Sequence, residues 1–148
     1  ERGSWSSRIT GVNDEFPSDA GEGMTAVALL CQIFMGEDPD KNDMLQKHGD
    51  LMLEKLPEWD PDGLKNDLYY WYYGTFAMNQ WGGNEWKAWK KAIEKALLPN
   101  QRQDKGNFKG SWDPVGPWGE DGGRVYSTAI CALILEVYYR YAQVLGAR

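Results

Sequence analysis

The stretch Trp59-Asp60-Pro61-Asp62-Gly63, followed by Thr75, indicates how this chain folds because a second copy lies further along. That copy is Trp112-Asp113-Pro114-Val115-Gly116, with Thr128 at the same offset as Thr75. A looser third copy has Gly3-Ser4-Trp5, which matches Gly110-Ser111-Trp112, leading to Thr25-Ala26. A spacing of roughly 50 residues is typical of arrays of stacked supersecondary units. We therefore expect one domain over residues 1–148, with repeats at about 3–57, 58–99 and 100–148.

Composition narrows the classes of partner. The net charge of −6 and the isoelectric point near 4.8 argue against a non-specific grip on nucleic acid. No apolar run reaches the ~18 residues that a membrane span needs, and the charged fraction of 26% is typical of a soluble globular protein. Cys31 and Cys131 are expected to be small buried apolar residues, although a disulfide between adjacent helices stays open. Whether the protein is extracytoplasmic is undecided for the same reason.

Hydrophobic periodicity predicts helices and no strands. The five predicted helices cover about residues 21–35, 42–56, 65–82, 84–98 and 124–144. Pro57 and Pro99 end the second and fourth helices, and Asn84 is expected to cap the fourth. These two have one apolar face, whereas the first, third and fifth are apolar nearly all round and are expected to be buried on most sides. The alternation predicts an all-α fold of antiparallel helix pairs, with inner and outer helices.

The long loop over residues 100–123 combines Gly, Pro and Asp with the aromatic residues Phe108, Trp112 and Trp118. A flexible linker would not carry such side chains. We predict an ordered loop whose aromatic side chains fill gaps between repeats, each indole N–H donating to a backbone carbonyl.

Gln101 or Gln103, followed by Gly110-Ser111-Trp112, resembles the Gln…Gly-x-Trp motif of the terpene cyclase and prenyltransferase repeat superfamily. Residues 67–75 and 122–141 are similar to bacterial proteins of unassigned activity that carry prenyltransferase/squalene-oxidase repeats. The resemblance covers nearly the whole chain and implies a partial α/α toroid, roughly half of an (α/α)6 barrel. It also implies that the chain is the C-terminal part of a longer protein, or an incomplete ring that pairs with another copy.

The catalytic residues of that superfamily do not match this sequence. The cyclases use an Asp-x-Asp-Asp acid, whereas Asp38-Pro39-Asp40-Lys41 and Asp60-Pro61-Asp62-Gly63 are expected to be turns in which Asp caps backbone N–H groups. The zinc-binding histidine of the prenyltransferase β subunits aligns with Ser127. The only histidine, His48, is expected on an outer helix as a packed or half-exposed residue. No cofactor and no zinc site are expected from this chain.

A weak calcium alternative rests on the spacing of Asp38, Asp40 and Asn42. It departs from the calcium-loop pattern at its sixth position, where Asp43 replaces Gly, and at its twelfth, where Gly49 replaces Glu.

The remaining candidate site is aromatic and lies near the starts of the inner helices, which the resemblance places toward a central cavity. Tyr73 and Tyr126 both precede a repeat threonine by two residues, so we expect them at equivalent positions. The predicted pocket, for an apolar or carbohydrate-like ligand, consists of Tyr69, Tyr70, Trp71, Tyr73, Trp118, Arg124, Tyr126 and Ser127. The alternative is that these aromatic residues fill the core between helices.

The sequence therefore favours a non-catalytic repeat domain that serves as a ligand- or protein-binding scaffold. The alternative is a cavity-wall segment of a terpene cyclase/prenyltransferase-like enzyme whose catalytic residues lie outside this chain.

Overall fold

The computed structural model describes residues 22–63 and 65–140, and within these ranges every regular element is helical. The α-helices are α2 (Gly23–Phe34), α3 (Asp43–Glu54), α4 (Leu68–Trp81), α5 (Gly83–Leu97) and α6 (Gly119–Arg140), and the 3₁₀ turns are η1 (Pro39–Lys41) and η2 (Leu98–Asn100). The all-α prediction and the positions of its five helices are confirmed. The copy at Gly3-Ser4-Trp5 and the predicted helix end near Val144 lie outside the described residues.

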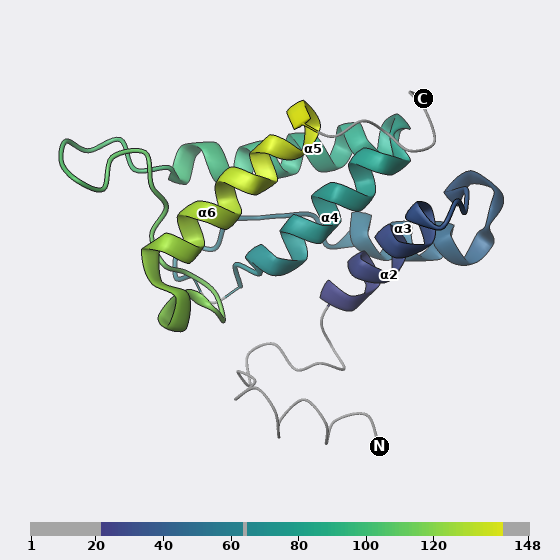
Figure 1. The fold of residues 1–148 in the computed structure, drawn as a ribbon, viewed down its shortest axis with the longest axis horizontal. Coiled ribbons are helices and arrows are strands. Elements are labelled where there is room, and N and C mark those ends of the chain that lie inside the picture. The colour runs from purple at the N-terminus through teal and green to yellow at the C-terminus, as the bar shows by residue number, and fades with distance from the viewer. Residues whose placement is uncertain (1–21, 64, 141–148) are drawn as a thin grey trace, which may run out of the picture.

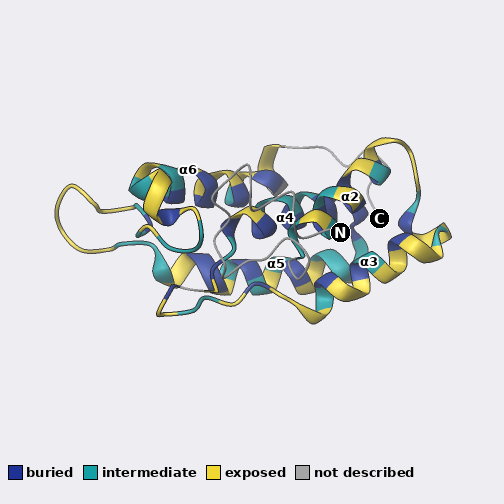
Figure 2. Cartoon of the chain, turned by 90° about the horizontal axis from the view of Figure 1, so that it is seen from below, coloured by how far each residue is buried: buried dark blue, intermediate teal, exposed yellow. Residues whose placement is uncertain are grey.

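The helices form two layers (Figure 2). In one layer α2, α4 and α6 lie side by side, with α4 in the middle and all three N-termini at the same end (Figure 1). In the other layer α5 packs against α4, and α3 packs against α2 and α5. The helices that follow the repeat loops therefore share one layer, as the alternation of inner and outer helices predicted.

Helix α4 is the centre of the core. Its N-cap is Asp67, whose Oδ1 accepts a hydrogen bond from the Tyr70 backbone N–H at 2.9 Å. Gly74 lets the ring of Trp89 in α5 approach so closely that a Cβ at position 74 would lie 2.4 Å from it. The Trp89 indole N–H donates to Thr75 Oγ1 at 2.9 Å, and that hydroxyl donates to the Trp71 carbonyl at 2.6 Å. The repeat threonine thus anchors the neighbouring outer helix.

The prediction that the first and fifth helices are buried on most sides is wrong. On α6, Val125 is 82% exposed and Tyr139 is 84% exposed, and on α2 Met24 is 65% exposed. Only α4 has a neighbour on each side, because among the described residues α2 and α6 stand at the two ends of their layer. Cys31 is exposed for the same reason, against prediction, whereas Cys131 is buried as predicted, and both thiols are free.

Two helix starts are set by glycine instead of by side-chain caps. The N-cap of α5 is Gly82, with φ of 84°, so Asn84 does not cap this helix as predicted and instead accepts a hydrogen bond from Lys87. The backbone of α6 breaks at Gly123, where φ is 57° and ψ is −162°. The continuous part of α6 therefore begins at Arg124, as predicted, after a short helical turn.

The two repeat turns are joined directly. Gly63 and Gly116 both have left-handed φ values, 82° and 74°, and the Gly116 N–H donates to the Gly63 carbonyl at 3.0 Å. A Cβ at Gly116 would lie 2.0 Å from the carbonyl oxygen of Asn66. The Asn66 amide exchanges two hydrogen bonds with the backbone of Asp60, at 2.8 and 3.0 Å. Both positions favour glycine because φ is positive, and at Gly116 a Cβ would also collide with the backbone of Asn66.

Hydrogen bonds brace the loop before α6, as predicted. The Gln101 side chain donates to the Gly110 carbonyl at 2.8 Å, so Gln101, and not the exposed Gln103, holds the Gly-Ser-Trp segment. Buried Trp112 fills a gap and donates its indole N–H to the Leu97 carbonyl at 2.9 Å. Phe108 and Trp118 do not fill gaps as predicted, because they are 52% and 39% exposed.

Candidate functional site

A row of five aromatic rings runs from α2 along one side of α4. The distances between ring centroids are 6.1 Å for Phe34–Phe76, 6.0 Å for Phe76–Tyr72, 5.2 Å for Tyr72–Tyr73 and 4.7 Å for Tyr73–Tyr69. Phe34 and Tyr69, at its two ends, are 49% and 39% exposed, and the three rings between them are partly buried. We call these five residues the aromatic row.

The aromatic row faces away from the outer helices. With 3.6 residues per turn, Tyr69, Tyr73 and Phe76 lie on the opposite side of α4 from Trp71 and Gly74. Gly74 packs against the ring of Trp89 in α5, and the ring centroids of Trp71 and Trp59 lie 6.3 Å apart. One side of α4 therefore makes the core, while the other presents aromatic rings at the surface.

Polar groups gather at the Tyr69 end of the aromatic row. Burial raises the pKa of Asp67 above its ordinary value, although the backbone N–H of Tyr70 opposes this. Burial also raises the pKa of Tyr126 to about 12, and the charge of Asp67 adds to that rise. The Tyr126 hydroxyl and the Oγ of fully buried Ser127 have no hydrogen-bond partner among the described residues. Buried hydroxyls without partners are uncommon, so the Tyr126 hydroxyl marks an unsatisfied polar group beside the aromatic row.

The structure divides the predicted pocket residues between different environments. Tyr69 and Tyr73 belong to the aromatic row, with Tyr126 and Ser127 near its polar end. Tyr70 is 4% exposed, and its hydroxyl donates to the carbonyls of Met52 and Lys55 at 3.3 and 3.1 Å. Trp71 is 3% exposed. These two side chains fill the core, as the alternative expected.

Arg124 makes a structural contact. Its guanidinium donates to Asp113, as does Arg102, and it lies 4.3 Å above the ring of Phe108. Burial would raise the pKa of Asp113, but the hydrogen bonds and charges of Arg124 and Arg102 outweigh it and hold that pKa below its usual range. Arg124 therefore fixes the loop onto the start of α6. Trp118 lies in the same loop, partly exposed.

One side-chain oxygen of each residue in the weak calcium alternative accepts a hydrogen bond from the protein. Asp38 Oδ1 accepts from the Asp40 backbone N–H at 3.1 Å, and Asn42 Oδ1 accepts from Met44 N–H at 3.0 Å. Asp40 Oδ1 accepts from the indole of Trp81 at 2.9 Å. Asp38 and Asn42 therefore act as caps.

Metal-ligand geometry is also lacking elsewhere in the described part of the chain. There, no three His, Cys, Asp or Glu side chains are arranged to hold a metal ion. His48 lies on α3 and is half-buried, as predicted.

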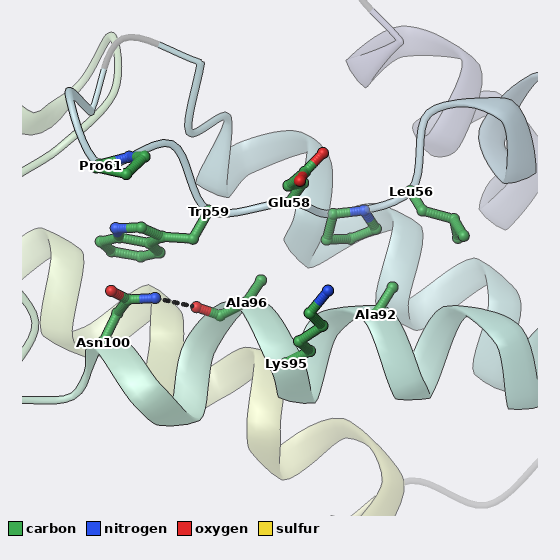
Figure 3. A pocket seen from close by; sticks show the side chains of 9 residues that line it. Leu56, Glu58, Trp59, Pro61, Ala92, Lys95, Ala96 and Asn100 are labelled. Carbon is green, nitrogen blue, oxygen red and sulfur yellow. Dashed lines mark hydrogen bonds between the residues drawn. The ribbon is translucent and has the colours of Figure 1, made fainter.

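A second surface feature was missed from the sequence. An open groove of about 490 Å³ lies between the segment that follows α3 and the C-terminal half of α5 (Figure 3). Its lining residues are Leu56, Pro57, Glu58, Trp59, Pro61, Ala92, Lys95, Ala96 and Asn100. The repeat pattern used Trp59 only as the counterpart of Trp112 and gave no sign of a groove. The two differ in environment, since Trp112 is buried and Trp59 is only partly buried.

Comparison with known proteins found no matching family model, no matching curated protein and no matching solved structure. Over residues 22–63 and 65–140, no helix combines the length and the apolar character needed to cross a membrane.

Proposed function

We propose that this chain is a non-catalytic helical repeat domain, arranged as part of an α/α toroid, that binds an elongated apolar ligand along the aromatic row. The observation that carries this proposal is the aromatic row itself, which stays partly exposed on the layer formed by α2, α4 and α6. The resemblance to toroidal repeat proteins supports the proposal, because it assigns this layer to the wall of a central cavity.

Physical chemistry favours an apolar ligand with one polar end. Each half-exposed ring offers apolar surface whose removal from water contributes about 25 cal/mol per Å². The buried hydroxyl of Tyr126 lies near one end of the aromatic row without a partner among the described residues, and we infer that ligand binding opens it to a ligand hydroxyl. A long-chain alcohol has this combination of groups.

Isothermal calorimetry with farnesol and with dodecanol tests the proposal. The test variant is Phe34→Ala, which removes one end of the aromatic row. The matched control is Phe108→Ala, because Phe34 and Phe108 are 49% and 52% exposed. We expect Phe34→Ala to weaken binding about tenfold, the cost of roughly 1.4 kcal/mol of contact, and Phe108→Ala to leave it unchanged. Absence of binding, or equal losses in the two variants, would contradict the proposal.

We also propose that the uncovered sides of α2 and α6 pair with another copy of the chain. Met24 on α2 and Met35 at its C-cap, and Val125 and Leu133 on α6, are exposed apolar side chains at the two ends of one layer. Pairing α6 of each copy with α2 of the other would close a ring of two copies and bury both sets. Sedimentation equilibrium should show a dimer that Val125→Lys converts to a monomer. The control Leu51→Lys, at a 50% exposed position on α3 in the other layer, should remain dimeric, and a monomeric parent protein would disprove the pairing.

One observation favours the alternative, a cavity-wall segment of an enzyme. A carboxyl group with a raised pKa, that of Asp67, lies beside Tyr69 and Tyr126 at the end of the aromatic row. Carboxyl groups whose pKa is raised by burial recur in catalytic sites. Mass spectrometry after incubation with farnesol would detect any product. Turnover that disappears in Asp67→Asn would favour the enzyme, whereas ligand binding without turnover would favour the scaffold.

A further inference from the structure

We propose that the groove at Trp59 is a second binding site, for a neutral mono- or disaccharide. This site is separate from the aromatic row and does not depend on it. Trp59 and α5 lie on the core side of α4, while the aromatic row lies on the other side. The volume of about 490 Å³ falls within the ~300–1,000 Å³ of typical small-molecule sites.

The groove is preformed, because its walls are held by contacts within the protein. On one wall, Pro57 and Pro61 restrict the backbone, and Trp59 packs against buried Trp71 at 6.3 Å. Asp60 beside it is held by two hydrogen bonds to Asn66. The other wall is regular helix. Little conformational entropy is therefore lost when a ligand binds.

The shape of the groove comes from small side chains facing a large flat one. Ala92 and Ala96 leave space along α5, and the indole of Trp59 projects from the facing segment above Ala96 and Asn100 (Figure 3). An indole face offers a flat apolar surface, which suits the C–H face of a pyranose ring, while its N–H stays at the edge as a donor.

The polar groups of the groove match hydroxyls. Asn100 Nδ2 donates to the Ala96 carbonyl at 2.9 Å, which fixes the amide and leaves its Oδ1 as an acceptor. Lys95 extends from α5 toward the opposite wall, which carries Glu58 (Figure 3). Among the described residues, neither Lys95 nor Glu58 has an ion-pair or hydrogen-bond partner. The groove therefore offers both donors and acceptors, and each hydroxyl of a sugar can act as either.

Charge selects a neutral ligand. The groove carries one ammonium group and one carboxylate, so its lining has no net charge with which to attract an anion or a cation. The whole chain has a net charge of −6, which further disfavours phosphates and other anions. An uncharged sugar is repelled by neither Lys95 nor Glu58 and can form hydrogen bonds to both.

The test is a titration of the ¹⁵N-labelled protein with methyl β-glucoside, N-acetylglucosamine, cellobiose and maltose, followed by nuclear magnetic resonance. The reporters are the indole N–H of Trp59, identified by its loss in Trp59→Phe, and the side-chain amide of Asn100. We expect saturable shifts of both reporters with at least one neutral sugar. Gluconate and glucosamine, the charged comparators, should bind about tenfold more weakly or not at all.

Two alanine replacements on α5 provide matched variants. Ala92→Leu fills the groove, while Ala88→Leu, one turn earlier at an exposed position outside the lining, leaves it open. Both keep a strong helix former, so folding is preserved in each. We expect Ala92→Leu to abolish the sugar-dependent shifts and Ala88→Leu to retain them. The proposal is overturned if no neutral sugar moves the reporters, if Ala92→Leu binds like the parent protein, or if charged sugars bind equally well.

Discussion

Replacing Gly74 with alanine tests whether close packing of α4 against Trp89 organises the core. A Cβ at position 74 would lie 2.4 and 2.6 Å from Cζ2 and Cη2 of Trp89, so the ring would have to move by about 1 Å to reach normal contact. Trp89 is fully buried, with Tyr70 packed edge-on at 5.5 Å. The ring therefore has little room to move.

Opposing effects decide how far Gly74→Ala changes the free energy of unfolding. Alanine is favoured over glycine in a helix by about 1 kcal/mol. Overpacking costs about 1–3 kcal/mol, and loss of the buried Trp89–Thr75 hydrogen bond costs about 1–3 kcal/mol more. We expect the free energy of unfolding of Gly74→Ala to fall by about 1–5 kcal/mol.

Urea denaturation followed by far-ultraviolet circular dichroism measures this change. The control is Gly23→Ala, because its new Cβ would lie 3.6 Å from Tyr69, an ordinary contact. The control should be as stable as the parent protein or slightly more stable. The effect of Gly74→Ala should shrink in a Trp89→Phe background, where the smaller ring leaves space. Equal stability of the two alanine variants, or strict additivity with Trp89→Phe, would refute the packing argument.

Three further predictions concern the repeat turn, the thiols and the tyrosines. Gly116→Ala should lower the free energy of unfolding by about 2–4 kcal/mol, because φ is positive and the new Cβ would lie 2.0 Å from the Asn66 carbonyl oxygen. Gly106→Ala is the control, since φ is also positive there but the space around it is open, and it should lower the free energy of unfolding less. Urea denaturation measures both changes. A thiol reagent should modify exposed Cys31 in the native protein and Cys131 only after unfolding, because Cys131 is buried and burial raises its pKa to about 12; equal rates would contradict this. Burial raises the pKa of Tyr126 to about 12, so the neutral phenol stabilises the fold fully below pH ~10. As the pH rises from 10 to 12, the free energy of unfolding should fall by at most ~1.4 kcal/mol per pH unit because of this group. Tyr126→Phe should remove this contribution from the pH dependence of stability.

The sequence predicted the fold where a single element carried the signal. Each helix position followed from its own periodicity, and the long loop followed from its aromatic residues. Burial of α2 and α6 could not be predicted in this way, because an apolar helix does not reveal how many neighbours it has. Val125 and Met24 are exposed since each belongs to a helix at the end of a layer.

The candidate site could be predicted only in part, for a related reason. An inner helix that is aromatic on every side gives no helical register, so Tyr70 and Trp71 could not be separated from Tyr69 and Tyr73. Phe34 completes the aromatic row from another helix, which is a tertiary contact with no local signal. The groove at Trp59 could not be predicted, because the sequence match with Trp112 does not reveal that Trp59 is only partly buried.

The hydrogen bond between Gly63 and Gly116 joins the two repeat turns in one direction, from a backbone N–H in the later turn to a carbonyl in the earlier one. The Gly63 carbonyl accepts from Asn66 within its own turn and, through its second lone pair, from Gly116 of the next repeat. The Gly116 carbonyl accepts from Gly119 in its own turn, and no second backbone donor reaches it within residues 22–63 and 65–140. The Gly116 carbonyl thus keeps one lone pair in the place where the Gly63 carbonyl accepts the next turn. Duplication of one unit would lengthen such an array without inventing a new junction.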